Sequence, residues 1–414
     1  MRAMRLATSL VCFVLVGGFA VAQADSWPRF RGPTNTDHSP DAGLLKEWPD
    51  SGPERLWLFE DAGYGYSGFS VQGGRLYTMG TRDDSTILLC LDAESGEEVW
   101  ATEVGAILSN GWGDGPRSTP TVDGEHVYTV GGLGGILCVE AATGAKVWSS
   151  EMSDFGGDVP RWGYSESLLV DGDQVICTPG GSEGAVVALN KKTGEMVWQC
   201  EDFTGKAEYS STVVAELHGV RQYVRLLQTT LGGIDSKTGE LLWSADWPGR
   251  TAVCPTPIVN GNQVYVTSGY NVGSMLVEVG ADGETKKLWQ NKVMNNHHGG
   301  VVRVGDHLYG HADRGWVCQS WEDGSEVWLD RSLRKGAIHY ADGMLYCVEE
   351  RSGAVALVEA SADGYREASR FTLSPQSEIR SRRGRIWVHP VVIGGRLFLR
   401  DQEYVYCYDV KSSE

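Results

Sequence analysis

Short runs of alternating apolar and polar residues recur along most of this chain, and most of them follow a turn made of glycine and a polar residue. Clear examples are GGRLYTMG at 73–80, GEHVYTVG at 124–131 and GNQVYVTSG at 261–269. Alternation with a period of two is typical of β-strands that bury one face, and glycine supplies the positive φ that a tight hairpin needs. The pattern predicts an all-β protein made of short antiparallel strands.

A second phrase recurs after these strands and combines an apolar strand, a tight polar turn and a strand that ends near tryptophan. Its clearest copies are CLDAESGEEVW at 90–100, CVEAATGAKVW at 138–148, ALNKKTGEMVW at 188–198 and GIDSKTGELLW at 233–243. The closing tryptophans of these copies are 45 to 50 residues apart, and eight units of this kind fit the chain. Such a period, with several short strands in each unit, is typical of propeller blades. We therefore predict an eight-bladed β-propeller.

The two ends of the chain predict how the ring of blades closes. The last unit, at 391–410, ends before its final strand, whereas an unattached strand-like segment at 54–59 precedes the first complete unit. We expect this N-terminal strand to complete the last blade, because closure removes the exposed sheet edges. The expected domains are an irregular lead-in at 25–53, a single propeller at 54–410 and a tail at 411–414.

The tryptophan phrase also carries a family resemblance. Ala188, Asn190, Thr193, Gly194 and Trp198 follow the docking pattern A-x-D-x-x-T-G-x-x-x-W, with asparagine in the acidic position. The chain resembles the pyrroloquinoline-quinone-type (PQQ-like) propellers, and its WPRFRGP start resembles exported members from planctomycete-type bacteria. This resemblance implies a propeller related to quinoprotein alcohol dehydrogenases and to the non-catalytic BamB-like scaffolds of outer-membrane assembly.

The N-terminus and the charge indicate where the protein acts. Residues 1–24 are predicted to be a cleaved signal peptide, since two arginines precede an apolar run at 6–19 and Ala22-Gln23-Ala24 offers a cleavage site. The mature protein is expected to be exported, to the periplasm or beyond, without a membrane span. The net charge of -18 argues against binding to nucleic acid or anionic lipid. We expect a monomer.

The cysteines are predicted to be buried hydrophobic residues rather than disulfide partners. Equivalent strands in adjacent blades are about 10 Å apart, whereas a disulfide requires Cα atoms within about 7 Å. Four cysteines occupy the same position in different repeats and two more lie on apolar strands, namely Cys90, Cys138, Cys318, Cys407, Cys177 and Cys347. Cys200 and Cys254 lie nearer to loops and are left unassigned.

The propeller topology predicts a binding site at one mouth of the central channel. The first residues of the innermost strands converge there, and a concave mouth with polar and aromatic residues is a favoured ligand site. The candidates are Tyr66, Arg117, Ser118, Tyr164, Glu166, Tyr209, His297, His298 and His389. Each hydroxyl has a structural alternative, because it can pair with loop backbone. An ion pair between Arg117 and Glu166 would also be a structural explanation.

Metal and cofactor chemistry have weaker signals. His298, His311 and Asp313 are candidate metal ligands, although their spacing matches no established metal motif, and no metal is assigned. Catalysis with PQQ would require a calcium site and a carboxylate base, for which Glu166 is the first candidate. The chain contains neither a C-x-x-C-H haem motif nor the adjacent cysteine pair that resemblance to the alcohol dehydrogenases would imply.

We therefore expect an exported propeller that acts as a non-catalytic binding or scaffold protein in the cell envelope. Its expected partner is an envelope protein, a peptide or a small polar ligand at the channel mouth. The alternative is a PQQ-dependent alcohol or sugar dehydrogenase that uses PQQ, calcium and an external electron acceptor. The propeller alone cannot decide between them, because the same fold hosts both roles.

Overall fold

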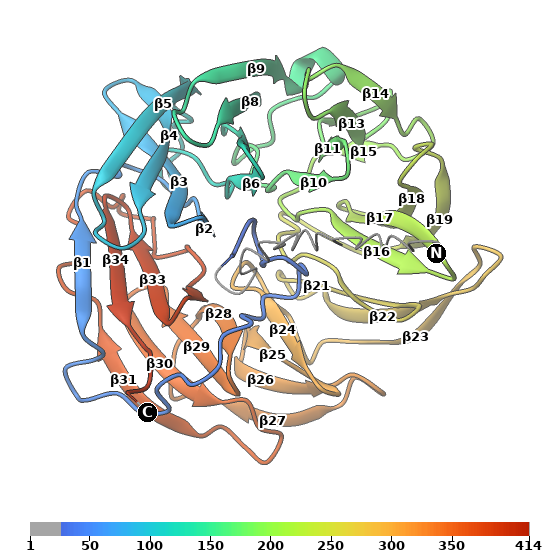
Figure 1. The fold of residues 1–414 in the computed structure, drawn as a ribbon. Coiled ribbons are helices and arrows are strands. Elements are labelled where there is room, and N and C mark those ends of the chain that lie inside the picture. The colour runs from blue at the N-terminus through green and yellow to red at the C-terminus, as the bar shows by residue number, and fades with distance from the viewer. Residues whose placement is uncertain (1–25, 414) are drawn as a thin grey trace, which may run out of the picture.

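The structure is a computed structural model that describes residues 26–413, and these residues form a ring of eight four-stranded antiparallel sheets (Figure 1). The eight-bladed, all-β architecture predicted from the repeats is confirmed. Each sheet is a meander whose first strand lies at the central channel and whose fourth strand lies at the perimeter. The signal peptide predicted at 1–24 lies outside the described residues.

Four blades come from the first part of the chain. They comprise β2 (Ser70–Gln72), β3 (Arg75–Arg82), β4 (Ser85–Asp92) and β5 (Glu98–Ala106); β6 (Thr121–Asp123), β7 (His126–Val130), β8 (Gly135–Glu140) and β9 (Lys146–Glu151); β10 (Leu169–Asp171), β11 (Gln174–Cys177), β13 (Val187–Asn190) and β14 (Met196–Gln199); and β16 (Val213–Leu217), β17 (Val220–Leu226), β18 (Thr230–Asp235) and β19 (Leu241–Asp246). A 3-10 helix, η2 (Met152–Phe155), and the small ladder of β12 (Gly180–Gly181) with β15 (Gly205–Lys206) connect parts of this half.

The other four blades complete the ring. They comprise β20 (Ile258–Asn260), β21 (Gln263–Ser268), β22 (Gly273–Val279) and β23 (Thr285–Asn291); β24 (Val301–Val304), β25 (His307–Ala312), β26 (Gly315–Ser320) and β27 (Glu326–Asp330); β28 (Gly336–Ala341), β29 (Met344–Glu349), β30 (Ala354–Glu359) and β31 (Glu367–Thr372); and β32 (Val391–Ile393), β33 (Arg396–Asp401), β34 (Tyr404–Asp409) and β1 (Arg55–Phe59).

The N-terminal strand closes the last blade, as the sequence predicts. β1 pairs antiparallel with β34, and Trp57 lies opposite Cys407. Trp57 also reaches the first blade, where its indole N–H donates to the carbonyl oxygen of Ala93 at 3.2 Å. A Cβ on Gly96 would lie 2.6 Å from the Trp57 ring, so this indole packs directly against a glycine turn. One residue therefore joins the two ends of the ring.

The same contact holds neighbouring blades together elsewhere. Trp100 donates its indole N–H to Ala141 in the next blade at 3.1 Å, and Trp148 donates to Lys191 at 2.8 Å. The glycines beneath these rings, Gly144 and Gly194, have positive φ and would bring a Cβ to 2.6 Å from an indole atom. The tryptophan phrase is thus an inter-blade lock, which explains why tryptophan and glycine recur together.

The segment at residues 27–38, which we call the plug, crosses the centre of the ring (Figure 1). Trp27 forms a β-bridge with Val71 of the first blade, and the Arg31 guanidinium donates to the carbonyl oxygen of Val301 in the sixth at 2.9 Å. His38 forms a β-bridge with the seventh blade. The plug therefore contacts innermost strands on opposite sides of the channel.

The cysteines and the helix content agree with a packed β-protein. All eight cysteines of the described part are free, and the six assigned from the repeats as buried hydrophobic residues are buried, which confirms that assignment. Cys200 is also buried, whereas Cys254 is partly exposed. Within residues 26–413, no helix has the length and apolar character needed to cross a membrane.

Candidate functional site

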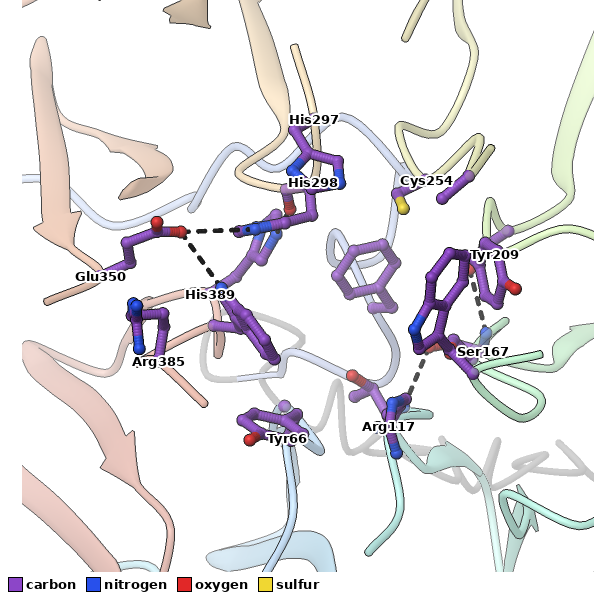
Figure 2. A pocket seen from close by; sticks show the side chains of 18 of the residues that line it. Tyr66, Arg117, Ser167, Tyr209, Cys254, His297, His298, Glu350, Arg385 and His389 are labelled. Atoms are coloured by element: carbon purple, nitrogen blue, oxygen red, sulfur yellow. Dashed lines mark hydrogen bonds and ion pairs between the residues drawn. The ribbon is translucent and has the colours of Figure 1, made fainter. Parts of the chain in front are cut away.

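A cavity of about 330 Å³ opens at the channel mouth, above the plug. The loops that enter the innermost strands form its walls, and Trp27, Phe30, Arg31 and Asp37 of the plug form its floor. Figure 2 shows Tyr66, Arg117, Tyr209, His298 and His389 arranged around this common space. The lead-in segment is therefore part of the cavity, a contribution that the sequence analysis did not anticipate.

Six of the nine predicted site residues line the cavity, and three lie behind its wall. The lining residues are Tyr66, Arg117, Tyr209, His297, His298 and His389. Tyr164 and Ser118 are buried, and their hydroxyls donate to backbone carbonyls, Tyr164 to Pro179 at 3.1 Å and Ser118 to Thr119 at 3.4 Å. These two hydroxyls therefore pair with loop backbone, which was the structural alternative to binding a ligand.

Glu166 is a buried structural carboxylate. Its side chain forms an ion pair of 3.0 Å with Arg225 on β17 and accepts the backbone N–H of Thr178. Burial raises the pKa of Glu166, while Arg225 and the Thr178 N–H act in the opposite direction. The Arg117–Glu166 pair considered from the sequence does not form. Arg117 instead donates to the carbonyl oxygen of Gly115 at 2.8 Å.

One wall of the cavity carries a hydrogen-bonded group that we call the Lys335 cluster, made of Tyr270, His297, His298, Lys335 and Glu350. Lys335 Nζ lies 2.7 Å from His297 Nδ1 and 3.2 Å from His298 Nε2. Glu350 Oε2 lies 3.7 Å from Lys335 Nζ and 3.4 Å from His298 Nε2. The Tyr270 hydroxyl is 2.8 Å from His297 Nε2. The cluster therefore concentrates proton donors and acceptors on one side of the cavity.

Burial sets the protonation of this cluster. Desolvation, with a further contribution from Lys335, lowers the pKa of His297 to about 3 and holds that of His298 well below its ordinary value. Burial also lowers the pKa of Lys335, although Glu350 opposes this shift. At neutral pH both imidazoles are therefore uncharged, and each can accept a hydrogen bond from Lys335 Nζ.

The candidate metal ligands do not form a metal site. Across residues 26–413 there is no group of three or more histidine, cysteine, aspartate or glutamate side chains placed to hold an ion. His311 packs edge-on against Trp316 with ring centroids 5.5 Å apart, and the Asp313 carboxylate accepts a hydrogen bond from Asn295. Both side chains thus have structural partners.

The charge of the cavity is opposite to that of the protein. The chain carries a net charge of -18, yet the cavity lining contains six cationic side chains and two carboxylates. The cations are Arg31, Arg117, Lys335, Arg351, Arg383 and Arg385. Of the carboxylates, Asp37 is buried against His339 at 2.8 Å, and Glu350 belongs to the Lys335 cluster. Low-dielectric walls of one charge focus the field, so the cavity favours an anionic ligand.

Many of the residues that line the cavity are aromatic. Several of them were not predicted from the sequence, namely Trp27, Phe30, Phe69, Trp112, Trp162, Tyr270 and Trp387. Lys335, Glu350 and the arginines of the last inter-blade loop were not predicted either. One signal was available in the sequence, because the basic run RSRRGR at 380–385 is unusual in an acidic chain. Such a run in a loop beside the channel would have indicated the cationic wall.

The ring of tryptophan-locked blades with a cavity at its mouth defines a PQQ-type β-propeller. The chain belongs to the family described as outer membrane protein assembly factor BamB, whose model matches residues 50–154 and 83–330. It is 24% identical to "Outer membrane protein assembly factor BamB" of Burkholderia pseudomallei over 372 residues, which cover 78% of this chain and 92% of the relative.

Other relatives connect the chain to quinoproteins. It is 26% identical to "Quinoprotein alcohol dehydrogenase PedH" of Pseudomonas putida over 193 residues, 42% of this chain and 31% of that enzyme, so less than a third of the enzyme is matched.

Among solved structures, BamB from Moraxella catarrhalis superimposes with a TM-score of 0.61 at 15% identity, covering 87% of this chain and 98% of the other. A quinohemoprotein alcohol dehydrogenase from Comamonas testosteroni gives 0.63 at 11% identity, covering 95% and 82%. At these identities, the structural matches support the fold alone.

Proposed function

We propose that this protein is a non-catalytic binding propeller of the cell envelope, exported and monomeric, which holds an acidic ligand at the channel mouth. The ligand is an acidic small molecule, or an acidic group on a peptide or an envelope protein. One observation carries the proposal, namely the cavity with an excess of cations and aromatic walls in a protein of charge -18. Guanidinium groups pair with carboxylates, and aromatic faces bury the apolar body of a ligand.

The positions of the carboxylates support binding rather than catalysis. Glu166 is held by Arg225 away from the cavity, and Glu350 is engaged by Lys335 and by the indole N–H of Trp387 at 3.1 Å. Neither stands free beside the cavity as a general base would. The relative named as an assembly factor supports a partner in the envelope.

Calorimetric titration with 4-methylbenzoate, a small aromatic acid, tests the proposal. We expect saturable binding that weakens with salt and falls at least about tenfold when Arg117 and Arg385 are both changed to alanine, since each charge-assisted contact is worth more than 1 kcal/mol. Lys286→Ala on β23 is the matched control, because this cation lies on an exposed strand outside the cavity. Failure of aromatic acids to bind, or equal binding by the Arg117/Arg385 variant, would refute the acidic-ligand proposal.

The quinoprotein relative and the size of the cavity support dehydrogenase activity as a second candidate. PQQ is a flat quinone that carries carboxylates, so the aromatic and cationic walls suit its shape and charge. Calcium fits less well, because Glu350 is engaged within the Lys335 cluster and no group of ion-binding side chains forms within residues 26–413. Reduction of an artificial electron acceptor by the protein with PQQ, calcium and an alcohol would establish the dehydrogenase and replace the binding proposal.

A further inference from the structure

We propose that Lys335 is a reactive amine that captures a carbonyl compound as an imine, and that the compound is an aldehyde or ketone that also carries an acidic group. The inference rests on the proposed function, because Lys335 lies on the wall of the same cavity. It extends that function by assigning a covalent step and the chemical class of the ligand.

Parts of three blades fix the position of the amine. His297 and His298 precede β24 of the sixth blade, and Lys335 itself enters β28 of the seventh. Glu350 follows β29 and accepts the indole N–H of Trp387, which belongs to the loop before β32 of the eighth blade. Lys335 Nζ is within 3.2 Å of both imidazoles and 3.7 Å of the carboxylate. A flexible side chain is thereby held in one place at the edge of the cavity.

The surroundings of Lys335 favour its nucleophilic form. A lysine attacks a carbonyl carbon only as the free amine, and burial lowers the pKa of Lys335. The two neighbouring imidazoles are uncharged, so each offers a nitrogen lone pair that can accept a hydrogen bond from the amine. Glu350 remains close enough to pair with a cationic nitrogen after reaction.

The reaction requires no oxidant, reductant or metal. The Nζ lone pair attacks the carbonyl carbon, the π electrons of the C=O bond move to oxygen, and one Nζ proton is transferred to that oxygen, which gives a neutral carbinolamine. His297 Nδ1, 2.7 Å from Nζ, accepts a hydrogen bond from the amine and orients its lone pair. The second Nζ proton is then transferred to the hydroxyl, the C–O bond breaks and water leaves as the C=N bond forms. The amine and the carbonyl compound become an imine and water.

The arginines and aromatic rings that line the cavity define the rest of the ligand. Arg117 and Arg385 line the same cavity as Lys335, and Trp387 and Tyr66 have ring centroids 4.9 Å apart beside them. An acidic group facing the arginines would place an aromatic or other flat body against these rings. An aromatic aldehyde with a carboxylate combines these features.

Reductive trapping tests the inference. The protein is incubated at pH 7 with 4-formylbenzoate and sodium cyanoborohydride, and modified lysines are quantified by peptide mass spectrometry. We expect Lys335 to be modified faster than the exposed Lys286, because burial lowers the pKa of Lys335 and so raises its free-amine fraction at pH 7. Lys335→Arg should abolish labelling at this position, since a guanidinium retains the charge but forms no imine, while labelling of Lys286 continues.

Two outcomes would overturn the inference, and binding of 4-methylbenzoate, which has no aldehyde, separates them. If wild-type protein binds 4-methylbenzoate but Lys335 is modified no faster than Lys286, the covalent step is wrong and the proposed function stands. If 4-methylbenzoate does not bind and Lys335 shows no preferential labelling, both are wrong. The wild-type comparison between two lysines of one folded chain remains informative even if the Lys335→Arg variant fails to fold.

Discussion

Glu208 couples the stability of the propeller to pH. Its side chain is 7% exposed, and its carboxylate accepts the backbone N–H of Val253 at 2.9 Å. Burial is the largest influence and raises the pKa of Glu208 to about 7, against the opposing effects of the Val253 N–H and Arg225. The ordinary value is 4.5, so the folded protein binds this proton more tightly than the unfolded chain does.

The sign of the effect follows from that difference. Below pH 4.5 the carboxyl is protonated in both states and costs nothing. As pH rises through this value and on to about 7, the unfolded chain gains from ionisation first, and the folded state loses relative stability. The interval between 4.5 and about 7, at about 1.4 kcal/mol for each pKa unit, corresponds to a loss of about 3 kcal/mol by pH 8.

Glu208→Gln removes this titration and keeps a carbonyl oxygen for the Val253 N–H. Urea unfolding followed by tryptophan fluorescence at pH 5, 6, 7 and 8 gives the free energy of unfolding of both proteins. We expect the variant to gain about 2.5 kcal/mol on wild type between pH 5 and pH 8, since part of the loss has already occurred by pH 5, with other titrating groups cancelling in the comparison. Glu216→Gln, at an exposed position on β16, is the control and should show little change. A difference between wild type and Glu208→Gln that does not vary with pH would refute the reasoning.

Two further predictions test the ring and its buried charges. Trp57→Ala should lower the free energy of unfolding by about 3 to 5 kcal/mol, because it removes a large buried side chain from the closing blade. A loss below about 0.5 kcal/mol in urea unfolding would contradict a role for Trp57 in closure. Arg225→Met should cost about 3 to 5 kcal/mol by leaving Glu166 buried without its partner. Adding Glu166→Gln should recover part of that loss, and a double variant as unstable as the single one would show that the ion pair is not the cause.

The fold was predictable because the sequence encodes it locally and repeatedly. The phrase at 90–100 contains both halves of a lock, namely Gly96, which receives the indole of Trp57, and Trp100, whose indole docks on the next blade. Closure by β1 was predictable for the same reason, since Trp57 occupies the position of the missing final tryptophan. A repeat that recurs at a nearly constant spacing leaves few alternative topologies.

The candidate site was only partly predictable, because the repeat does not encode the paths of the inter-blade loops. His297 and His298 were found from their place before an innermost strand, whereas Lys335, which enters the next blade, carried no pattern of its own. Glu166 was assigned to the channel mouth for the same positional reason, but its side chain points to Arg225, 59 residues later. The direction of a side chain at a strand entrance depends on tertiary partners, which spacing does not reveal.

The tryptophan contacts that hold the blades together lie at the perimeter, away from the charged cavity at the channel mouth. This separation explains how the scaffold accommodates such a cavity. Inter-blade locks such as Trp100 on Ala141 lie toward the outside, whereas several innermost strands, including β2 and β6, contain only three residues. Burial lowers the pKa of Lys335, so protonating this amine inside the cavity carries a free-energy cost. An acidic ligand would reduce that cost by pairing with the cations. Ligand binding should therefore raise the stability of the whole ring by an amount that grows with the logarithm of the ratio of ligand concentration to Kd, although the ligand contacts only the loops at its mouth.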